Sequence, residues 1–133
     1  MNIFLDTSAI FAFLDADDDH HPRAKELWRR VHEEGLGSLI THNYVLVETA
    51  ALIQRRLGGD ALRAFLEEIV PILSVVWVDA ETHGAAVSAL LAAGKRRFSL
   101  VDCVSFEVMR RLGIRSSIAF DRHFAEMGFD PLE

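Results

Sequence analysis

Near its start the chain reads IFLDTSAIFAFL (residues 3–14): an apolar run, a carboxylate with two hydroxyls, and a second apolar run. We interpret this stretch as a buried strand over residues 2–5, a sharp turn and a helix. Asp6, Thr7 or Ser8 is the expected helix cap, because their side-chain oxygens accept from free N–H groups at a helix start. Asp6 then lies at the carboxyl end of a strand, the edge of an open α/β sheet where ligands bind.

Strands and helices are expected to alternate along the rest of the chain. Further strands are expected at residues 38–41, 75–78, 117–120 and, as a weak edge strand, 128–132. Further helices are expected over roughly residues 22–34, 43–55, 60–71, 79–93 and 99–112. This alternation predicts an α/β fold with a parallel sheet and helices on both of its faces.

Length and composition indicate one compact domain over residues 1–133, since half of the residues are apolar and no linker or repeat is visible. The apolar stretches are too short to span a membrane, and we expect no signal peptide. With one cysteine no intrachain disulfide can form, so a cytoplasmic protein is the simple expectation. The net charge of −6 argues against broad nonspecific binding to nucleic acid.

Four acidic residues need an explanation beyond solvation. Asp6 and Asp121 each follow an apolar run, and parallel strands bring their carboxyl ends to one edge, although either residue could simply cap a helix. Glu48 has largely apolar neighbours at helical spacing, where a lone carboxylate is costly to bury. Instead of a role in a site, Glu48 could form an ion pair with an arginine, or the helix could be rotated so that Glu48 reaches water. Asp102 lies three residues after Ser99, which resembles a capping box.

Together these acids would repel one another strongly unless a cation compensates their charge. Mg²⁺ and Mn²⁺ prefer oxygen ligands and are the natural compensation. One or two such ions held by acids form an arrangement suited to attack on a phosphodiester.

At this point the chain resembles the PIN-domain ribonucleases, and within them the toxins of VapBC-type toxin–antitoxin pairs. The resemblance rests on IFLDTSAI (3–10), NYVLVET (43–49), FSLVDC (98–103) and AFDRHF (119–124). It implies a single three-layer α/β/α PIN-like domain, often dimeric, which cleaves RNA with Mg²⁺ or Mn²⁺ and leaves a 5′-phosphate and a 3′-hydroxyl. It also implies a cognate antitoxin protein as partner.

The resemblance assigns roles to the four acids. Asp6, Asp102 and Asp121 would hold the metal directly or through water, and Glu48 would be a further ligand or would orient the attacking water. Ser8 and Ser99 could support the carboxylates or the scissile phosphate, and helix capping explains them equally well. On this interpretation, Thr7 and Ser8 are left to cap the first helix.

Contacts to RNA are expected from the basic segment Lys95, Arg96 and Arg97, just before the helix that carries Asp102. A solvated loop explains this segment equally well. His123 follows Asp121 closely, but the sequence gives no firm reason to place it in the site.

Three other functions are compatible with parts of this sequence. A PIN-like RNA-binding module without catalysis or toxin role would fit the fold but not the full set of acids. A phosphatase with a strand-end Asp nucleophile usually needs a second acid two residues later, where this chain has Ser8. A phosphoacceptor domain would need paired acids at the first strand and a lysine at a later strand end.

Overall fold

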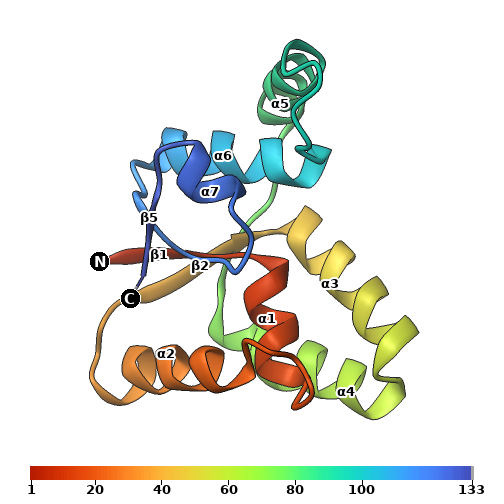
Figure 1. Cartoon of the computed structure of the whole chain (residues 1–133), viewed down its shortest axis with the longest axis vertical. Helices are drawn as coiled ribbons and strands as arrows, with labels where there is room; N and C mark the ends of the chain where they lie inside the picture. The colour runs from red at the N-terminus through yellow and green to blue at the C-terminus, as the bar shows by residue number, and fades with distance from the viewer. Residues whose placement is uncertain (133) are drawn as a thin grey trace.

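The computed structural model describes residues 1–132, and its centre is a five-stranded parallel sheet (Figure 1). The strands are β1 (Asn2–Leu5), β2 (Ser38–His42), β3 (Ser74–Val76), β4 (Ser116–Ile118) and β5 (Asp130–Pro131). Their order across the sheet is β3-β2-β1-β4-β5, so the N-terminal strand is central. Leu5 pairs with Ile118 and Phe4 with Ile40, which aligns the carboxyl ends of the three inner strands.

Helices cover both faces of the sheet. They are α1 (Thr7–Leu14), α2 (His21–Glu33), α3 (Asn43–Arg56), α4 (Gly59–Ala64), α5 (Ala80–Ala92), α6 (Leu100–Leu112) and α7 (His123–Glu126). In Figure 1, α1, α2 and α4 lie on one side of the sheet, and α5, α6 and α7 lie on the other. The predicted three-layer α/β/α fold is therefore confirmed.

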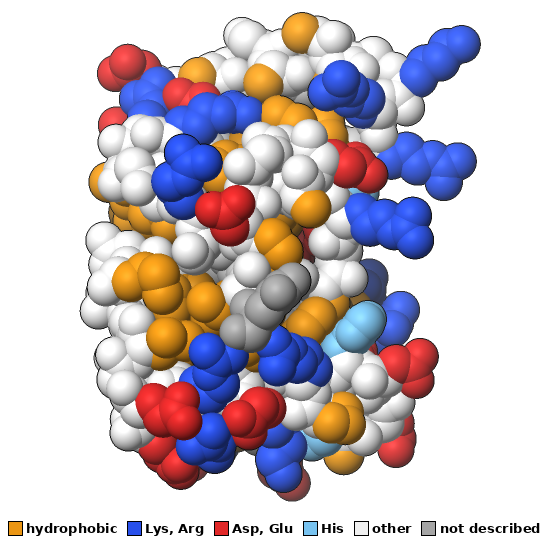
Figure 2. Space-filling model, turned by 60° about the vertical axis from the view of Figure 1, so that its left-hand side comes forward, with side chains coloured by type: hydrophobic (Ala, Val, Ile, Leu, Met, Phe, Trp, Pro, Cys, Tyr) orange, Lys and Arg blue, Asp and Glu red, His pale blue; other side chains and the backbone are white. Residues whose placement is uncertain are grey.

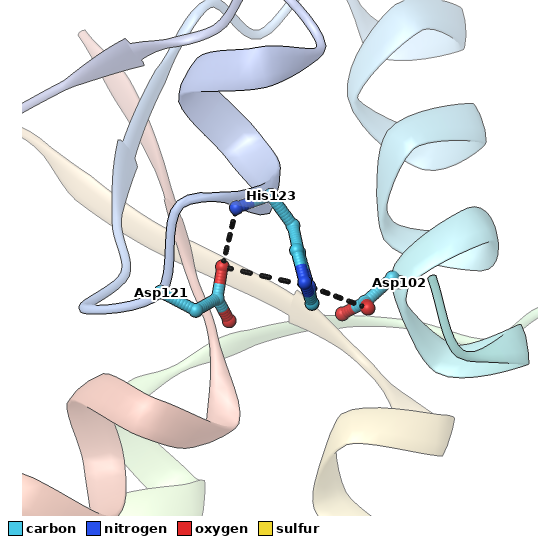
Figure 3. A group of neighbouring side chains, drawn as sticks. All are labelled: Asp102, Asp121 and His123. Carbon is cyan, nitrogen blue, oxygen red and sulfur yellow. Dashed lines mark hydrogen bonds and ion pairs between the residues drawn. The ribbon is translucent and has the colours of Figure 1, made fainter. Parts of the chain in front are cut away.

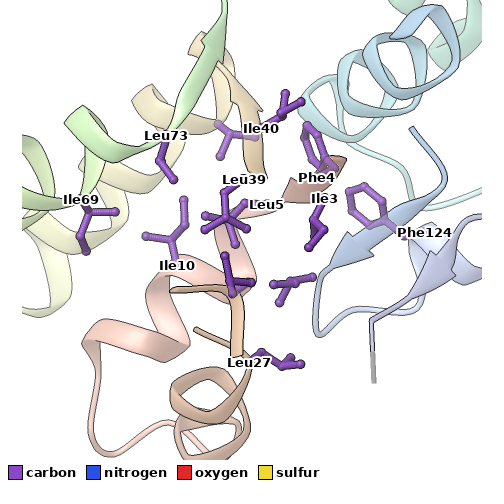
Figure 4. Close-up of a cluster of buried hydrophobic side chains, with 14 of the residues drawn as sticks. Ile3, Phe4, Leu5, Ile10, Leu27, Leu39, Ile40, Ile69, Leu73 and Phe124 are labelled. Atoms are coloured by element: carbon purple, nitrogen blue, oxygen red, sulfur yellow. The ribbon is translucent and has the colours of Figure 1, made fainter. Parts of the chain in front are cut away.

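The central strand is buried because both of its faces are covered. Ile3, Phe4 and Leu5 are almost fully buried, as expected for a parallel strand that reads as a continuous apolar run. Ile10 of α1 and Leu27 of α2 pack into the same cluster, which Figure 4 shows around β1. Burial of such side chains stabilises the fold by about 1.5–3 kcal/mol each, so the end of β1 is held firmly.

One predicted helix, over residues 60–71, is interrupted. Regular α-helix ends at Ala64, and a π-helical turn (Phe65–Ile69) and a 3₁₀ turn (Val70–Ile72) follow it. Pro71 lies in the 3₁₀ turn and has no N–H to continue a helical ladder. The chain then enters β3, which ends at Val76 rather than at residue 78 and leaves the Trp77 side chain 75% exposed.

The surface mixes charges of both signs. Figure 2 shows Lys and Arg side chains interspersed with Asp and Glu, beside an exposed hydrophobic area, on one face of the molecule. Within residues 1–132, no helix is long and apolar enough to cross a membrane.

Candidate metal centre

Asp6 lies at the end of the central strand and is buried, with 4% of its surface exposed. Its Oδ2 accepts hydrogen bonds from Ser8 Oγ at 2.8 Å and from the Ser8 backbone N–H at 3.3 Å. Asp6 itself is therefore the N-cap of α1, and the expectation that Thr7 and Ser8 take over this task is wrong. Because Thr7 and Ser8 are already inside the helix, Ser8 is free to hold the Asp6 side chain.

Ser8 also ties Asp6 to a distant segment. Its Oγ accepts a hydrogen bond from the backbone N–H of Phe120 at 2.9 Å, and the Asp6 N–H donates to the Ile118 carbonyl at 3.2 Å. These two bonds fix the chain after β4 beside the start of α1. They bring Asp121 toward Asp6 even though the two residues are far apart in the sequence.

The electrostatics of Asp6 show that the acids are crowded. Burial, and then the nearby charge of Asp121, raise its pKa to about 7, against the smaller opposing effect of the Ser8 hydrogen bonds. Burial and the charge of Asp102 likewise raise the pKa of Asp121. Three carboxyl groups thus share one region of the sheet edge, and the repulsion expected from the sequence is present.

Asp102 lies in the first turn of α6 and is 8% exposed. Its N–H donates to Ser99 Oγ and its Oδ2 accepts from the Ser99 N–H, both at 3.0 Å. The capping box predicted from the sequence is therefore confirmed. It holds the Asp102 carboxylate in one orientation at the helix start, where negative charge is favoured.

His123 is a site residue that the sequence prediction left out. Its Nδ1 lies 2.9 Å from Asp102 Oδ2 and 3.9 Å from Asp121 Oδ1, and its backbone N–H donates to Asp121 Oδ1 at 3.0 Å (Figure 3). The only signal in the sequence was its position two residues after Asp121. A short turn after a strand-end Asp can bring the residue at i+2 back over the carboxylate.

Glu48 differs from Asp6 and Asp102 in being exposed. It lies on the exposed side of α3, so the alternative of a helix rotation that lets Glu48 reach water describes the structure. Its neighbour Thr49 is buried and donates a hydrogen bond to Thr7 Oγ1 at 3.1 Å. Because Thr7 directly follows Asp6, this bond keeps Glu48 near the same end of the sheet, and its role in the site stays a prediction.

A hollow of about 440 Å³ opens beside the acids. It is lined by Arg96, Arg97, Phe98, His123 and Glu126. The exposed guanidinium groups of Arg96 and Arg97 thus share a cavity wall with His123, whereas the exposed Lys95 does not line this hollow. Two of the three residues expected to contact RNA therefore lie beside the candidate metal centre.

The donor set fits a divalent cation. One ligand atom each from Asp102, Asp121 and His123 lies within 4.8 Å of the others. These residues would hold such an ion, and it would supply positive charge to offset the two carboxylates. His123 Nδ1 is buried and lacks a hydrogen bond of acceptable geometry, which leaves it available to a cation.

The fold and this acidic edge define a class of protein. The PIN domain family model matches residues 3–130, so the chain belongs to the PIN domain family.

The chain is similar to proteins of the VapC type. It is 37% identical over 128 residues to the 23S rRNA-specific endonuclease VapC20 of Mycobacterium tuberculosis, covering 96% of this chain and 95% of that protein. A VapC ribonuclease of Archaeoglobus fulgidus is 28% identical over 129 residues, with 94% and 80% coverage.

Solved structures agree with this likeness. The crystal structure of VapC20, described as a toxin that cleaves the sarcin–ricin loop, superposes with a TM-score of 0.86 at 37% identity, over 96% of this chain and 95% of that chain. FitAcB from Neisseria gonorrhoeae superposes with a TM-score of 0.72 at 15% identity, over 100% and 97% of the two chains. At that identity FitAcB shows the shared fold alone.

Proposed function

We propose that this protein is a metal-dependent endoribonuclease and the toxin of a type II toxin–antitoxin pair. The observation that carries the proposal is that the hydrogen bonds of Asp6 and Ser8 to the chain after β4, and the close approach of Asp102 to Asp121, bring three acids to one sheet edge in a chain of the PIN family. Relatives named as VapC ribonucleases, aligned over nearly the whole chain, support the reaction type.

The proposed ligands of the cation are Asp6, Asp102 and Asp121, with Glu48 acting through water. The cation, Mg²⁺ or Mn²⁺, would supply positive charge beside the scissile phosphate and lower the pKa of an attacking water. Ser8 and Ser99 hold Asp6 and Asp102 in place, so they act as positioning residues. Arg96 and Arg97 would bind RNA phosphates in the neighbouring hollow, because guanidinium groups suit bidentate phosphate contacts.

The proposed substrate is ribosomal RNA. VapC20 is named for action on 23S rRNA, and its similarity to this chain extends over both chains almost completely. A protein of this type would act in the cytoplasm, as a homodimer that a cognate antitoxin protein restrains. Light scattering of the purified protein tests the dimer, and co-purification with the product of the neighbouring reading frame tests the antitoxin.

The central experiment incubates the purified protein with total cellular RNA and Mn²⁺ or Mg²⁺, and maps new 5′ ends by sequencing. We expect discrete cleavage sites in ribosomal RNA that vanish with EDTA. Asp6→Asn and Asp102→Asn should each lower cleavage by about 100-fold or more, because removal even of groups that only support a metal ligand costs about 10- to 100-fold.

The control is Asp19→Asn, which removes an exposed acid from the loop between α1 and α2. It should cleave as the wild type does. RNA binding without any metal-dependent cleavage would favour the noncatalytic RNA-binding module instead.

A further inference from the structure

His123 is held over the acidic edge by its own backbone. It is the first residue of α7, and its N–H donates to Asp121 Oδ1 at 3.0 Å. This bond closes a tight turn between Asp121 and the helix, so the imidazole projects back toward the carboxylates of Asp121 and Asp102, as Figure 3 shows. The ring is placed by the same turn that places the acid.

The His123 imidazole also packs against an aromatic ring, that of Phe98. The Phe98 ring meets the His123 ring nearly at right angles, with the ring centroids 5.4 Å apart. Phe98 in turn packs edge to face on Phe106 of the core, at 5.3 Å. Phe98 therefore links the imidazole to the core and supports it on one side, while 30% of the His123 side chain remains exposed.

The Nδ1 atom has charge partners but no proper hydrogen bond. It is 2.9 Å from Asp102 Oδ2, a normal hydrogen-bond length, yet the alignment of ring and carboxylate is poor. A buried polar atom that lacks a well-aligned hydrogen bond is costly. A cation between the imidazole and the two carboxylates would satisfy all three groups at once.

We propose that His123 Nδ1 is a direct ligand of the divalent cation, and that the site therefore binds Mn²⁺ in preference to Mg²⁺. The inference rests on the proposed function, because it concerns the metal centre of that nuclease. Its chemical basis is that Mg²⁺ favours a shell of oxygen ligands, whereas imidazole nitrogen suits transition-metal ions. One nitrogen among carboxylate oxygens shifts the selectivity of the site toward Mn²⁺.

The test measures metal binding directly, without activity. Mn²⁺ is bound to the full-length wild type, to His123→Ala, to His123→Asp and to the control His32→Ala, and the bound ion is examined by electron spin echo spectroscopy. His32 is exposed on α2, with Nδ1 bonded to the Trp28 carbonyl in its own helix. We expect nitrogen modulation from a coordinated imidazole in the wild type and in His32→Ala, and none in either His123 variant.

Isothermal titration supplies the second readout. His123→Ala should weaken Mn²⁺ binding by about tenfold or more, with a much smaller effect on Mg²⁺. His123→Asp replaces the nitrogen with an oxygen ligand, so its preference for Mn²⁺ over Mg²⁺ should fall below that of the wild type. Circular dichroism of each variant verifies that it is folded.

Nitrogen modulation that persists in His123→Ala, or that is absent from the wild type, would overturn the inference. So would an unchanged ratio of Mn²⁺ to Mg²⁺ affinity in both variants. These outcomes are distinct from failure of the proposed function, in which the wild type binds metal but cleaves no RNA. If only the inference fails, RNA cleavage remains metal-dependent while the His123 variants bind Mn²⁺ as the wild type does.

Discussion

At the scale of the residue, Asp6 combines two tasks that the sequence presented as alternatives. Its carboxylate caps α1, and it is also the most buried member of the acidic group. Ser8 makes this possible, because it donates two hydrogen bonds to one carboxylate oxygen. Burial of the Asp6 carboxylate, and then the nearby charge of Asp121, raise the pKa of Asp6 despite these bonds.

The raised pKa of Asp6 predicts a pH-dependent stability in the absence of metal. Its pKa is about 7 in the folded protein, against 3.8 for an ordinary Asp, so the folded state keeps a proton that the unfolded chain has released. The corresponding stability is fully present below about pH 4 and is lost as the pH rises through 7. A shift of this size corresponds to roughly 4 kcal/mol.

Asp6→Asn removes this titration. In EDTA, its free energy of unfolding by urea should match the wild type at pH 4 and exceed it by a few kcal/mol at pH 8. Asp19→Asn should follow the wild type at both pH values. A constant difference between wild type and Asp6→Asn across this range would contradict the burial argument.

At the scale of the element, three residues of the candidate metal centre lie at the starts of helices. Asp6 caps α1, Asp102 completes the capping box of α6, and His123 is the first residue of α7.

The start of α3 is fixed by the buried His42. Its Nδ1 accepts a hydrogen bond from the Val45 N–H, and its Nε2 bonds Ser105 Oγ of α6 at 2.8 Å. Burial lowers the pKa of His42 to about 4, so it stays neutral and can accept this bond at pH 7.

The loop between α5 and α6 gives a prediction about RNA binding. Arg96→Ala/Arg97→Ala should weaken binding of a noncleavable single-stranded RNA and reduce the slope of log affinity against log salt by about 1.4, since each phosphate contact to a single strand contributes about 0.7. Fluorescence anisotropy at several salt concentrations measures both quantities. The expectation follows from the position of these two residues beside His123.

A charge-matched control separates contact from net charge. Arg23→Ala/Arg63→Ala removes two exposed arginines from α2 and α4, which lie on the far side of the sheet from α5 and α6 (Figure 1). Its salt slope should equal that of the wild type. Equal losses in the two double variants would show that only the overall charge matters.

At the scale of the whole molecule, the candidate metal centre joins parts of the chain that no local structure connects. Asp6 follows β1, Asp102 begins α6, and Asp121 follows β4. A cation held by these acids would bind the folded protein and not the unfolded chain. It should therefore stabilise the molecule globally, by about 2.7 kcal/mol at a concentration 100 times its Kd.

Calorimetry tests this coupling between metal and fold. The Tm of the wild type should rise by several degrees when EDTA is replaced by saturating Mn²⁺, since about 1 kcal/mol shifts the Tm of a domain near this size by a few degrees. Asp102→Asn should show little or no rise. A rise of the same size in Asp102→Asn would place the ion elsewhere on the protein.

The sequence by itself determined the alternation of strands and helices, the parallel sheet and the position of Asp6 and Asp121 near one edge. These features follow from local patterns, since a short apolar run that ends at an Asp, as at residues 3–6 and 118–121, is typical of a strand followed by a helix start. The capping box of Ser99 and Asp102 could likewise be predicted from the sequence, because its hydrogen bonds join residues only three positions apart. The sequence does not indicate the interruption after Ala64, because a π-helical turn has no clear sequence pattern.

Only the tertiary structure decided which side chains meet. His123 enters the group because the turn after Asp121 and the Phe98 ring aim its imidazole at Asp102, a residue on another element. Glu48 faces solvent because Thr49, and not Glu48, packs toward Thr7 of α1. Helical spacing alone leaves the rotation of α3 open, and the packing of one helix on another sets it.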